Sequence, residues 1–363
     1  MRIAVDAYEI NRNYTGVGRY TFDLINALTK IDKENEYTLF FKESSELSSS
    51  LKEVNKIFLP SEKGYTHWQN FILNPELKKG NFDLFFATNY SLPIFFKGKS
   101  VLTVHDISWK VLKNDYSLKE RILKEIKSVI SFKKASLIFT VSEFTKDEVV
   151  KYYKTGPNKI IAIHSAINDK FHRADEDEIS DFKKRYSIQG EKLIGFLGSL
   201  FKRRHIKELI EVFKKLRKTE NKFSLILFGK IYDSEVKELI NSEGIFWNER
   251  IEDKYINAFY SSLNLFVYIS EYEGFGFPPL EALKCGIPSL LLKSSSLKEI
   301  YEKIALFVEN PSPEMIYEKL KEFFSNEKKY RDTIFSEFKK RENYFTWERA
   351  AKEYLENIKR LFK

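Results

Sequence analysis

The sequence has few of the features that mark secreted or membrane-spanning proteins. Its 363 residues include a single cysteine, Cys285, so no disulfide can form within the chain, and a reducing compartment is expected. No apolar run approaches the roughly 18 residues of a membrane span, and the opening MRIAVDAY is too short in its apolar part for a secretory signal. We therefore expect a cytoplasmic protein whose membrane attachment, if any, is peripheral and at the inner face of the membrane.

What the sequence does contain favours a folded, basic protein. The chain is longer than one hydrophobic core usually serves, and 43% apolar residues with 15% aromatics argue against disorder. A formal net charge of +9 suits an anionic substrate, an anionic membrane surface or nucleic acid. No nucleic-acid-binding motif is present, and we expect no nucleic acid partner.

Apolar runs of strand length alternate with amphipathic helices, which is typical of α/β domains with parallel sheets. A strand at Arg2–Asp6 is followed by a glycine-containing turn at residues 15–20 and then a helix. Apolar periodicity lapses over residues 168–191, which predicts a domain boundary near Phe171. We expect a first domain over 1–170, a second over 171–343 and a terminal helical segment over 344–363. The terminal helix itself is predicted over residues 341–363, and residues 294–299 are predicted to form a polar turn.

The most informative stretch is SEYEGFGFPPLEALKCGIP, residues 270–288. It follows an apolar strand, and its prolines and closing glycine predict a helix at Leu280–Cys285. Glu273 then lies in the loop after a strand and Glu281 in the first helical turn. Both carboxylates are expected at the carboxyl edge of the sheet, where open α/β sheets bind ligands.

The backbone between these two glutamates predicts an anion site. The prolines that follow carry no N–H, so the donors at this edge must come mainly from the amides of Gly274, Phe275, Gly276 and Phe277. The neighbouring carboxylates can accept hydrogen bonds from hydroxyl groups. Taken alone, either glutamate could instead be a solvated or dipole-complementing residue. Together, these features predict an anion joined to polyols as the ligand.

The block EGFGFPPLEALKCGIP, with seven residues between its outer glutamates, closely resembles the signature of family-4 retaining glycosyltransferases of the GT-B fold, also described as glycosyl transferases group 1. The resemblance implies an α/β protein of two doubly wound, Rossmann-like domains facing across a cleft. It also implies that the first domain binds the acceptor, the second binds a nucleotide-sugar donor, and the terminal helix crosses back to the first domain.

A basic cluster follows the first strand of the second half. After Gly198, two guanidiniums, Arg203 and Arg204, stand with His205 before a helix, where they could clamp a diphosphate. A charged helix start would look the same. The resembling family usually has Arg-Lys-Asn here, so Arg204 replaces a lysine and His205 an asparagine, and the two cations are not geometrically equivalent.

Two positions in the first half complete the predicted site. His105 ends the strand VLTV, where a catalytic group could stand, although a His–Asp pair also serves as a cap. The resemblance implies that His105 faces the donor sugar. It also implies that Gly16 lets the first-domain loop approach the donor diphosphate, although the glycine pair could form a plain turn.

The resemblance further implies a role for each residue of the second half. Glu281 would bind the ribose hydroxyls, Glu273 the sugar hydroxyls, and the amides of residues 275–277 with the two arginines the diphosphate. Sugar transfer would retain configuration through a same-face substitution that needs a stabilised leaving diphosphate. No Asp-x-Asp pair is placed to hold a divalent ion, so we expect no metal and no cofactor.

The expected function is transfer of a mannose- or glucose-type hexose from a GDP or UDP donor to a glycan, lipid-linked or small-molecule acceptor. The opening TGVGRYT resembles members that build bacterial surface polysaccharides. A nucleotide-sugar epimerase, a glycosidase and a non-enzymatic basic protein are the alternatives. A basic amphipathic helix at Ser117–Ser136 is either a solvated outer helix or a membrane-docking one.

Overall fold

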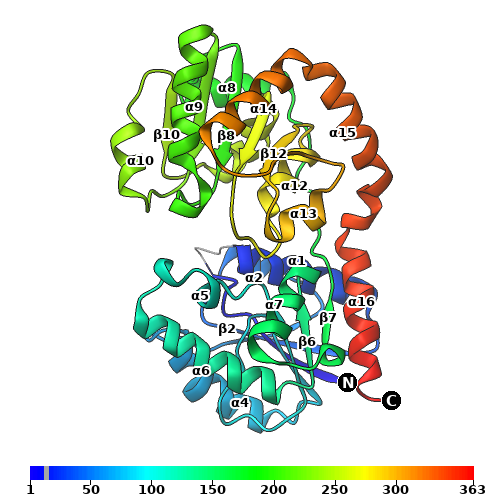
Figure 1. Ribbon diagram of the computed structural model, residues 1–363. Helices are drawn as coiled ribbons and strands as arrows, with labels where there is room; N and C mark the ends of the chain where they lie inside the picture. Colours follow the sequence, from blue (N-terminus) through cyan, green and yellow to red (C-terminus); the bar gives the residue numbers. More distant parts are fainter. Residues whose placement is uncertain (12–15) are drawn as a thin grey trace. The chain divides into compact units, whose positions relative to one another are not determined.

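The computed structural model describes residues 1–11 and 16–363, which form two compact units (Figure 1). Unit 1 comprises Met1–Ala166 and Tyr344–Lys363, and unit 2 comprises Ile167–Asn343. The boundaries predicted from the sequence are 170/171 and 343/344, and those of the two units are 166/167 and 343/344. Thr15, where the expected glycine turn begins, lies outside the described residues.

In its described residues, unit 1 contains a seven-stranded parallel sheet in the order β3-β2-β1-β4-β5-β6-β7. Its strands are β1 (Arg2–Asp6), β2 (Glu36–Phe41), β3 (Asn55–Phe58), β4 (Leu84–Ala87), β5 (Ser100–Val104), β6 (Leu137–Thr140) and β7 (Ile160–Ala162). Its helices are α1 (Gly16–Ile31), α2 (Glu46–Ser50), α3 (Tyr65–His67), α4 (Asn74–Lys79), α5 (Ser108–Val111), α6 (Leu118–Lys134), α7 (Glu143–Tyr153) and α16 (Trp347–Arg360), with a π-helical segment η1 (Trp68–Leu73) and short 3-10 turns.

Unit 2 contains a six-stranded parallel sheet in the order β10-β9-β8-β11-β12-β13. Its strands are β8 (Lys192–Leu197), β9 (Phe223–Phe228), β10 (Ile245–Asn248), β11 (Leu265–Tyr268), β12 (Ser289–Leu292) and β13 (Leu306–Val308). Its helices are α8 (Glu176–Arg185), α9 (Ile206–Thr219), α10 (Ser234–Leu239), α11 (Ile256–Ser262), α12 (Phe277–Lys284), α13 (Ser295–Tyr301), α14 (Pro313–Ser325) and α15 (Glu327–Arg341).

The two sheets share one topology, because in each the strand order reverses beside the unit's first strand. The reversal falls between β1 and β4 in unit 1 and between β8 and β11 in unit 2. Such a switch point leaves a crevice at the carboxyl ends of the two strands, because their connections leave in opposite directions. The expected fold class, two doubly wound α/β domains, is confirmed.

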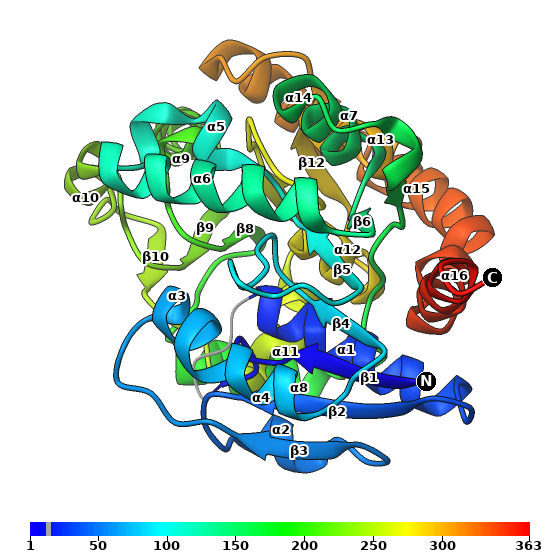
Figure 2. The ribbon, with the colours of Figure 1, turned by 90° about the horizontal axis from the view of Figure 1, so that it is seen from below.

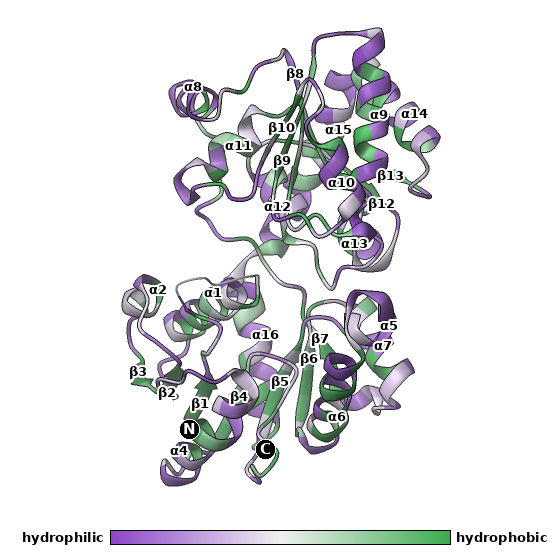
Figure 3. Ribbon diagram, turned by 90° about the vertical axis from the view of Figure 1, so that its left-hand side faces the viewer, coloured by the Kyte–Doolittle hydropathy of each residue, from purple (hydrophilic) through white to green (hydrophobic). Residues whose placement is uncertain are grey.

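The strands form because their residues suit burial on both faces. β9, with the sequence FSLILF, is buried at every position, and β5 and β6 are coloured mostly hydrophobic in Figure 3. A parallel sheet covered by helices needs such continuous apolar runs. None of the helices in the described residues is long and apolar enough to cross a membrane.

The terminal helix α16 packs on α1 within unit 1 (Figures 1 and 2). The buried hydroxyls of Tyr20 and Tyr354 lie 2.6 Å apart, and Tyr20 also lies 3.3 Å from the hydroxyl of Thr103 on β5. The Tyr354 ring packs 4.4 Å from the ring of Phe139. This contact makes the last residues of the chain part of the first unit's core.

Three local predictions were wrong. The helix expected at Leu280–Cys285 begins at Phe277, because Gly276 adopts φ +82° and the two prolines fit the first turn. Residues 294–299, expected as a polar turn, mostly belong to α13. The single helix expected over residues 341–363 is divided, since α15 ends at Arg341 and α16 begins at Trp347.

We predict that Tyr354→Phe destabilises unit 1, since the substitution removes the buried hydroxyl partner of Tyr20. The expected loss is about 1–2 kcal/mol of unfolding free energy. Urea unfolding followed by tryptophan fluorescence measures it. Tyr344→Phe is the matched control, because the hydroxyl of Tyr344 also has a partner, 2.8 Å away in His164, but its side chain is exposed. Equal losses in the two variants would contradict the role given to the buried pair.

Candidate active site

The predicted arginine and glutamate loops of unit 2 meet at its switch point. β8 ends at Leu197 and leads to a 3-10 turn that contains Arg203 and Arg204. β11 ends at Tyr268 and leads to the loop with Glu273. β8 and β11 are neighbouring parallel strands, so both loops leave the sheet at the same edge.

Glu273 is held by four hydrogen bonds that all end on one oxygen, Oε1. Arg204 donates from Nε at 3.0 Å and from Nη2 at 2.9 Å. The hydroxyls of Tyr268 and Ser270 donate at 2.9 and 2.8 Å. Within the described residues no hydrogen bond reaches Oε2. The arrangement fixes the carboxylate while leaving its second oxygen to accept from a ligand.

The neighbouring cations keep Glu273 ionised. Burial, the largest single influence, raises the pKa of its carboxyl, but the guanidiniums of Arg204 and Arg203, together with the hydrogen bonds from Ser270 and Tyr268, hold the pKa below its ordinary value of 4.5. Arg204 is also occupied on its remaining side, because Nη1 donates to the carbonyl of Ser199 at 2.9 Å. Arg203 lies over the ring of Phe201, with its guanidinium carbon 4.4 Å from the ring centre.

Gly198 makes room for the arginine that holds Glu273. Its φ of +142° lies in the region that favours glycine, and a Cβ there would lie 2.7 Å from Nη1 of Arg204. The absence of a side chain at residue 198 therefore has a structural cause. The carboxylates of Glu271 and Glu208 raise the pKa of the next basic residue, His205, although burial, the largest single influence, lowers it.

Glu281 stands in the second turn of α12 rather than in the first, since the helix begins at Phe277. It is buried, and the hydroxyl of Tyr260 donates to its Oε2 at 2.7 Å. Glu281 follows Glu273 by a loop and one helical turn. Both acids therefore belong to the connection that leaves β11 at the sheet's carboxyl edge.

The loop between the two acids, which contains Gly274, Phe275 and Gly276, is fixed from α13. The amide of Glu273 donates to Ser295 Oγ at 3.1 Å, and Ser296 Oγ donates to the Glu273 carbonyl at 2.8 Å. The Tyr301 hydroxyl donates to the carbonyl of Gly276. These contacts hold the chain at the start of α12, where Phe277 is the first helical residue.

Sequence reasoning missed these supporting side chains. Tyr268 and Tyr260 lie in apolar segments that predict only core packing, and the serines of α13 were assigned to a turn. The one available signal was the run SSS at residues 294–296, whose hydroxyls suit local hydrogen bonding to backbone.

Two predicted site residues lie in unit 1. His105 follows β5, its Nε2 lies 2.9 Å from the carbonyl of Thr88, and burial lowers its pKa. The imidazole is therefore neutral near pH 7, and this contact assigns the proton to Nε2. Gly16 is the first residue of α1, and no described atom lies within 4 Å of where its Cβ would stand, so packing does not explain the glycine.

A second polar cluster at the carboxyl edge of unit 1 was not predicted. Asp6, the last residue of β1, accepts from the Tyr65 hydroxyl at 2.7 Å and from the Tyr8 amide at 3.1 Å. Burial raises the pKa of Asp6 to about 6. Gln69 donates to the Tyr65 hydroxyl at 2.7 Å. The described residues contain no group of three or more His, Cys, Asp or Glu side chains that could hold a metal ion.

Comparison with known proteins defines the class. The solved structure of the Anabaena Alr3699/HepE protein in complex with UDP and glucose matches with a TM-score of 0.77 over 99% of both chains, at 12% identity, a likeness of fold alone. The fold is GT-B, as the sequence predicted. Residues 14–171 match the family model Glycosyltransferase Family 4, and residues 177–339 match Glycosyl transferases group 1. The chain is a glycosyltransferase and belongs to the family that these models describe.

Two curated relatives are bacterial mannosyltransferases. O-antigen chain mannosyltransferase B of Escherichia coli is 25% identical over 327 residues, which are 83% of this chain and 84% of that protein. The serotype-specific mannosyltransferase WbdA of Escherichia coli is 28% identical over 56% of this chain, and the match spans 26% of its own length.

We predict that Arg204→Ala destabilises unit 2 by about 3–5 kcal/mol, because it leaves the buried carboxylate of Glu273 without its cation. Arg204→Ala combined with Glu273→Leu should recover part of this loss. Denaturant unfolding of the two single variants and the double variant measures the coupling. Additive losses would contradict the pairing.

The pH dependence of this pair follows from the lowered pKa of Glu273. A carboxyl whose folded pKa is depressed stabilises the fold above its unfolded pKa, and that contribution is lost as the pH falls through the folded pKa. The cost of Glu273→Gln should therefore be largest near pH 7 and shrink below pH 4.5. A cost that does not change with pH would contradict an ionised Glu273.

Proposed function

We propose that this protein is a retaining glycosyltransferase that moves a mannose- or glucose-type hexose from a GDP or UDP donor to a hydroxyl group of an acceptor. The acceptor is a glycan, a lipid-linked saccharide or a small molecule in cell-surface polysaccharide or glycoconjugate synthesis. The observation that carries the proposal is Glu273, whose Oε1 is saturated by four donors while Oε2 is left to a sugar hydroxyl. The O-antigen relatives favour mannose, and the structure bound to UDP and glucose favours a UDP-sugar.

In this proposal the loops of unit 2 bind the donor. Glu273 accepts hydrogen bonds from the sugar, and Glu281 accepts them from the ribose. Arg203 and the amides of Phe275, Gly276 and Phe277 bind the diphosphate. Arg204 holds the Glu273 carboxylate and adds a second positive charge, since each of its three nitrogens already donates to a protein partner.

The chemical step needs stabilised charge more than a strong protein base. In a same-face substitution the bond from the sugar to the diphosphate breaks, and the oxygen of the acceptor hydroxyl forms a new bond to the same sugar carbon on the same face. The departing diphosphate takes the proton of that hydroxyl. Preorganised cations and amides lower the energy of that departing anion. We therefore propose that arginine side chains and backbone amides carry this charge and that transfer does not depend on a metal ion or a cofactor.

Unit 1 supplies the acceptor side of the proposed reaction. The neutral His105, whose Nε2 proton is held by the Thr88 carbonyl, presents Nδ1 as an acceptor for a sugar hydroxyl. Gly16 gives the diphosphate a close approach to the backbone of α1. The carboxyl-edge cluster around Asp6 and Tyr65 provides further polar groups for an acceptor.

We also propose that the enzyme works in the cytoplasm with peripheral contact at the inner face of the membrane. Lipid-linked acceptors are exposed at that surface, and the net charge of +9 favours approach to anionic lipids. This placement restricts neither the sugar nor the nucleotide base.

We predict that Glu273→Gln and Arg203→Ala each lower kcat/KM for sugar transfer by about 10²–10³, the usual loss when one charge-stabilising group is removed. Melting curves should show both variants folded. The matched control is Glu271→Gln, the same substitution two residues away on a side chain that is half exposed. An equal loss in the control would place the site elsewhere.

We predict that GDP or UDP raises the melting temperature at millimolar concentration and that Glu281→Gln weakens this binding by about 1–3 kcal/mol. A 2′,3′-dideoxy nucleotide should bind the wild-type protein about as weakly as the unmodified nucleotide binds Glu281→Gln. The affinity of the dideoxy nucleotide should fall little further in Glu281→Gln, because the missing hydroxyls and the substitution remove the same hydrogen bonds. Independent losses would contradict ribose binding by Glu281, and no shift with any nucleotide would contradict donor binding.

A further inference from the structure

Helix α6 exposes most of its aliphatic side chains to solvent and buries several polar ones, whereas a normal surface helix does the opposite. Helix α6 turns Lys127, Ser128 and Ser131 toward the body of unit 1, where they are buried together with Phe132. Its outward face exposes large aliphatic side chains: Leu118 is 67% exposed, Ile122 51%, Leu123 44%, Ile126 51% and Val129 50%. Soluble proteins rarely expose such a continuous apolar surface, and where they do it usually binds something.

The inward face of α6 shows why the helix keeps this orientation. Lys124 lies over the rings of Tyr90 and Trp109, at 5.0 and 5.1 Å from the ring centres. Lys127 contacts the hydroxyl of Thr66, and burial lowers its pKa to about 8. Ser131 Oγ accepts from the amide of Leu92 at 2.8 Å. Rotating the helix to bury its aliphatic residues would break all of these contacts.

Four of the exposed aliphatic residues form one stripe along the helix. Leu118, Ile122, Ile126 and Val129 are spaced by four, four and three residues, which places them on one face. A single straight stripe suits a helix lying in the plane of an interface.

The charges around the stripe favour an anionic surface. Lys119 and Lys133 are exposed on the same side of the helix. The two acids of α6 are engaged elsewhere, since Glu120 closes the capping box with Ser117 and Glu125 pairs with Lys110. A face with lysines among aliphatic residues is complementary to acidic lipids, which attract basic groups near the bilayer surface.

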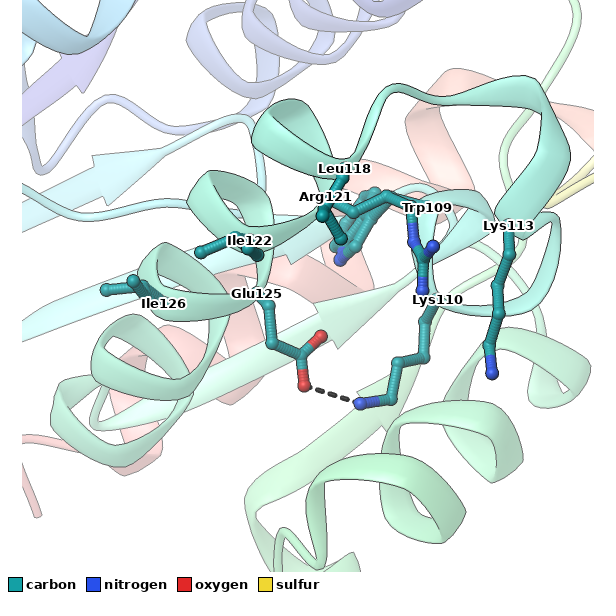
Figure 4. Close-up of a pocket in the computed structure, with 8 residues that line it drawn as sticks. All are labelled: Trp109, Lys110, Lys113, Leu118, Arg121, Ile122, Glu125 and Ile126. Carbon is teal, nitrogen blue, oxygen red and sulfur yellow. Dashed lines mark hydrogen bonds and ion pairs between the residues drawn. The ribbon is translucent and has the colours of Figure 1, made fainter.

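A hollow of about 280 Å³ lies beside the stripe, between α5 and α6 (Figure 4). Its lining combines the apolar residues Leu118, Ile122 and Ile126 and the ring of Trp109 with the cations Lys110, Lys113 and Arg121 and the carboxylate of Glu125. Figure 4 shows Lys110 joined to Glu125 and Lys113 apart from that pair. An acidic headgroup held at Lys113 and Arg121 would have its acyl chains next to the stripe.

We propose that the outward face of α6, with this hollow, docks the protein on an anionic lipid bilayer. The aliphatic stripe enters the boundary between headgroups and acyl chains, and the flanking cations contact lipid phosphates. The docking proposal rests on the proposed function in one respect only, the purpose of docking, which is to bring the enzyme to lipid-linked acceptors. Binding to lipid itself requires neither donor nor acceptor, so it can be tested apart from sugar transfer.

The test is cosedimentation of the full chain with vesicles of phosphatidylglycerol and phosphatidylcholine, compared with phosphatidylcholine alone. We expect binding to the anionic vesicles that weakens with added salt. Ile122→Gln with Ile126→Gln should lower the partition coefficient by at least roughly tenfold, because each isoleucine no longer gains from burial in lipid. Met315→Gln, at a 37% exposed apolar residue of unit 2, should leave it unchanged.

Two double variants with the same change in net charge distinguish the effect of the lysines beside the stripe from the effect of net charge alone. Lys119→Glu with Lys133→Glu should lower partition by about fivefold or more per lysine, whereas Lys328→Glu with Lys329→Glu, exposed lysines of α15, should have little effect. Equal binding in all variants, or no binding to anionic vesicles, would overturn the proposal. So would a dimer, detected by light scattering, that Ile122→Gln with Ile126→Gln dissociates, because a second copy would then cover the stripe.

Discussion

The candidate site depends on one buried contact, in which Arg204 and two hydroxyls saturate a single oxygen of Glu273. Four donors on Oε1 fix the orientation of the carboxylate, whose terminal torsion angle alone would leave it loosely defined. The direction of Oε2 is therefore set before any ligand arrives, and binding need not pay the entropy of ordering this side chain. The glycine at 198, the loop after β8 and the serines of α13 all serve to hold this contact in place.

The topology explains why this contact can form between residues almost 70 positions apart. β8 and β11 are distant in sequence but adjacent in the sheet, and both run parallel, so their carboxyl ends emerge together. Unit 1 repeats the arrangement. Asp6 ends β1, Thr88 follows β4, and the Thr88 hydroxyl donates to the Asp6 carbonyl at 2.8 Å. In both units the polar groups gather where the strand order reverses, since the diverging connections leave that edge uncovered.

The sequence predicted what depends on local pattern and missed what depends on tertiary contact. The strand Arg2–Asp6 was expected at its observed bounds, because buried parallel strands are continuous apolar runs. Glu273 could be singled out because glycine and proline surround it. The pairing of Arg204 with Glu273 could not be predicted, since no local pattern distinguishes an arginine that binds a ligand from one that binds a neighbouring carboxylate. The orientation of α6 was hidden for the same reason, because aromatic rings from other elements cover Lys124 and Lys127.

Stability alone does not account for the pair of Arg204 and Glu273. A buried ion pair loses the hydration of both charges, and apolar side chains of similar volume often give an equally stable or more stable fold. The tyrosine and serine that also donate to Oε1 add directional contacts where an apolar core would need none. Such a carboxylate, ionised and oriented at the edge of the sheet, is costly as a packing element and useful as an acceptor for hydroxyl groups. The same reasoning applies to α6, where aliphatic side chains in water contribute nothing to the folded state and gain free energy only when another surface covers them.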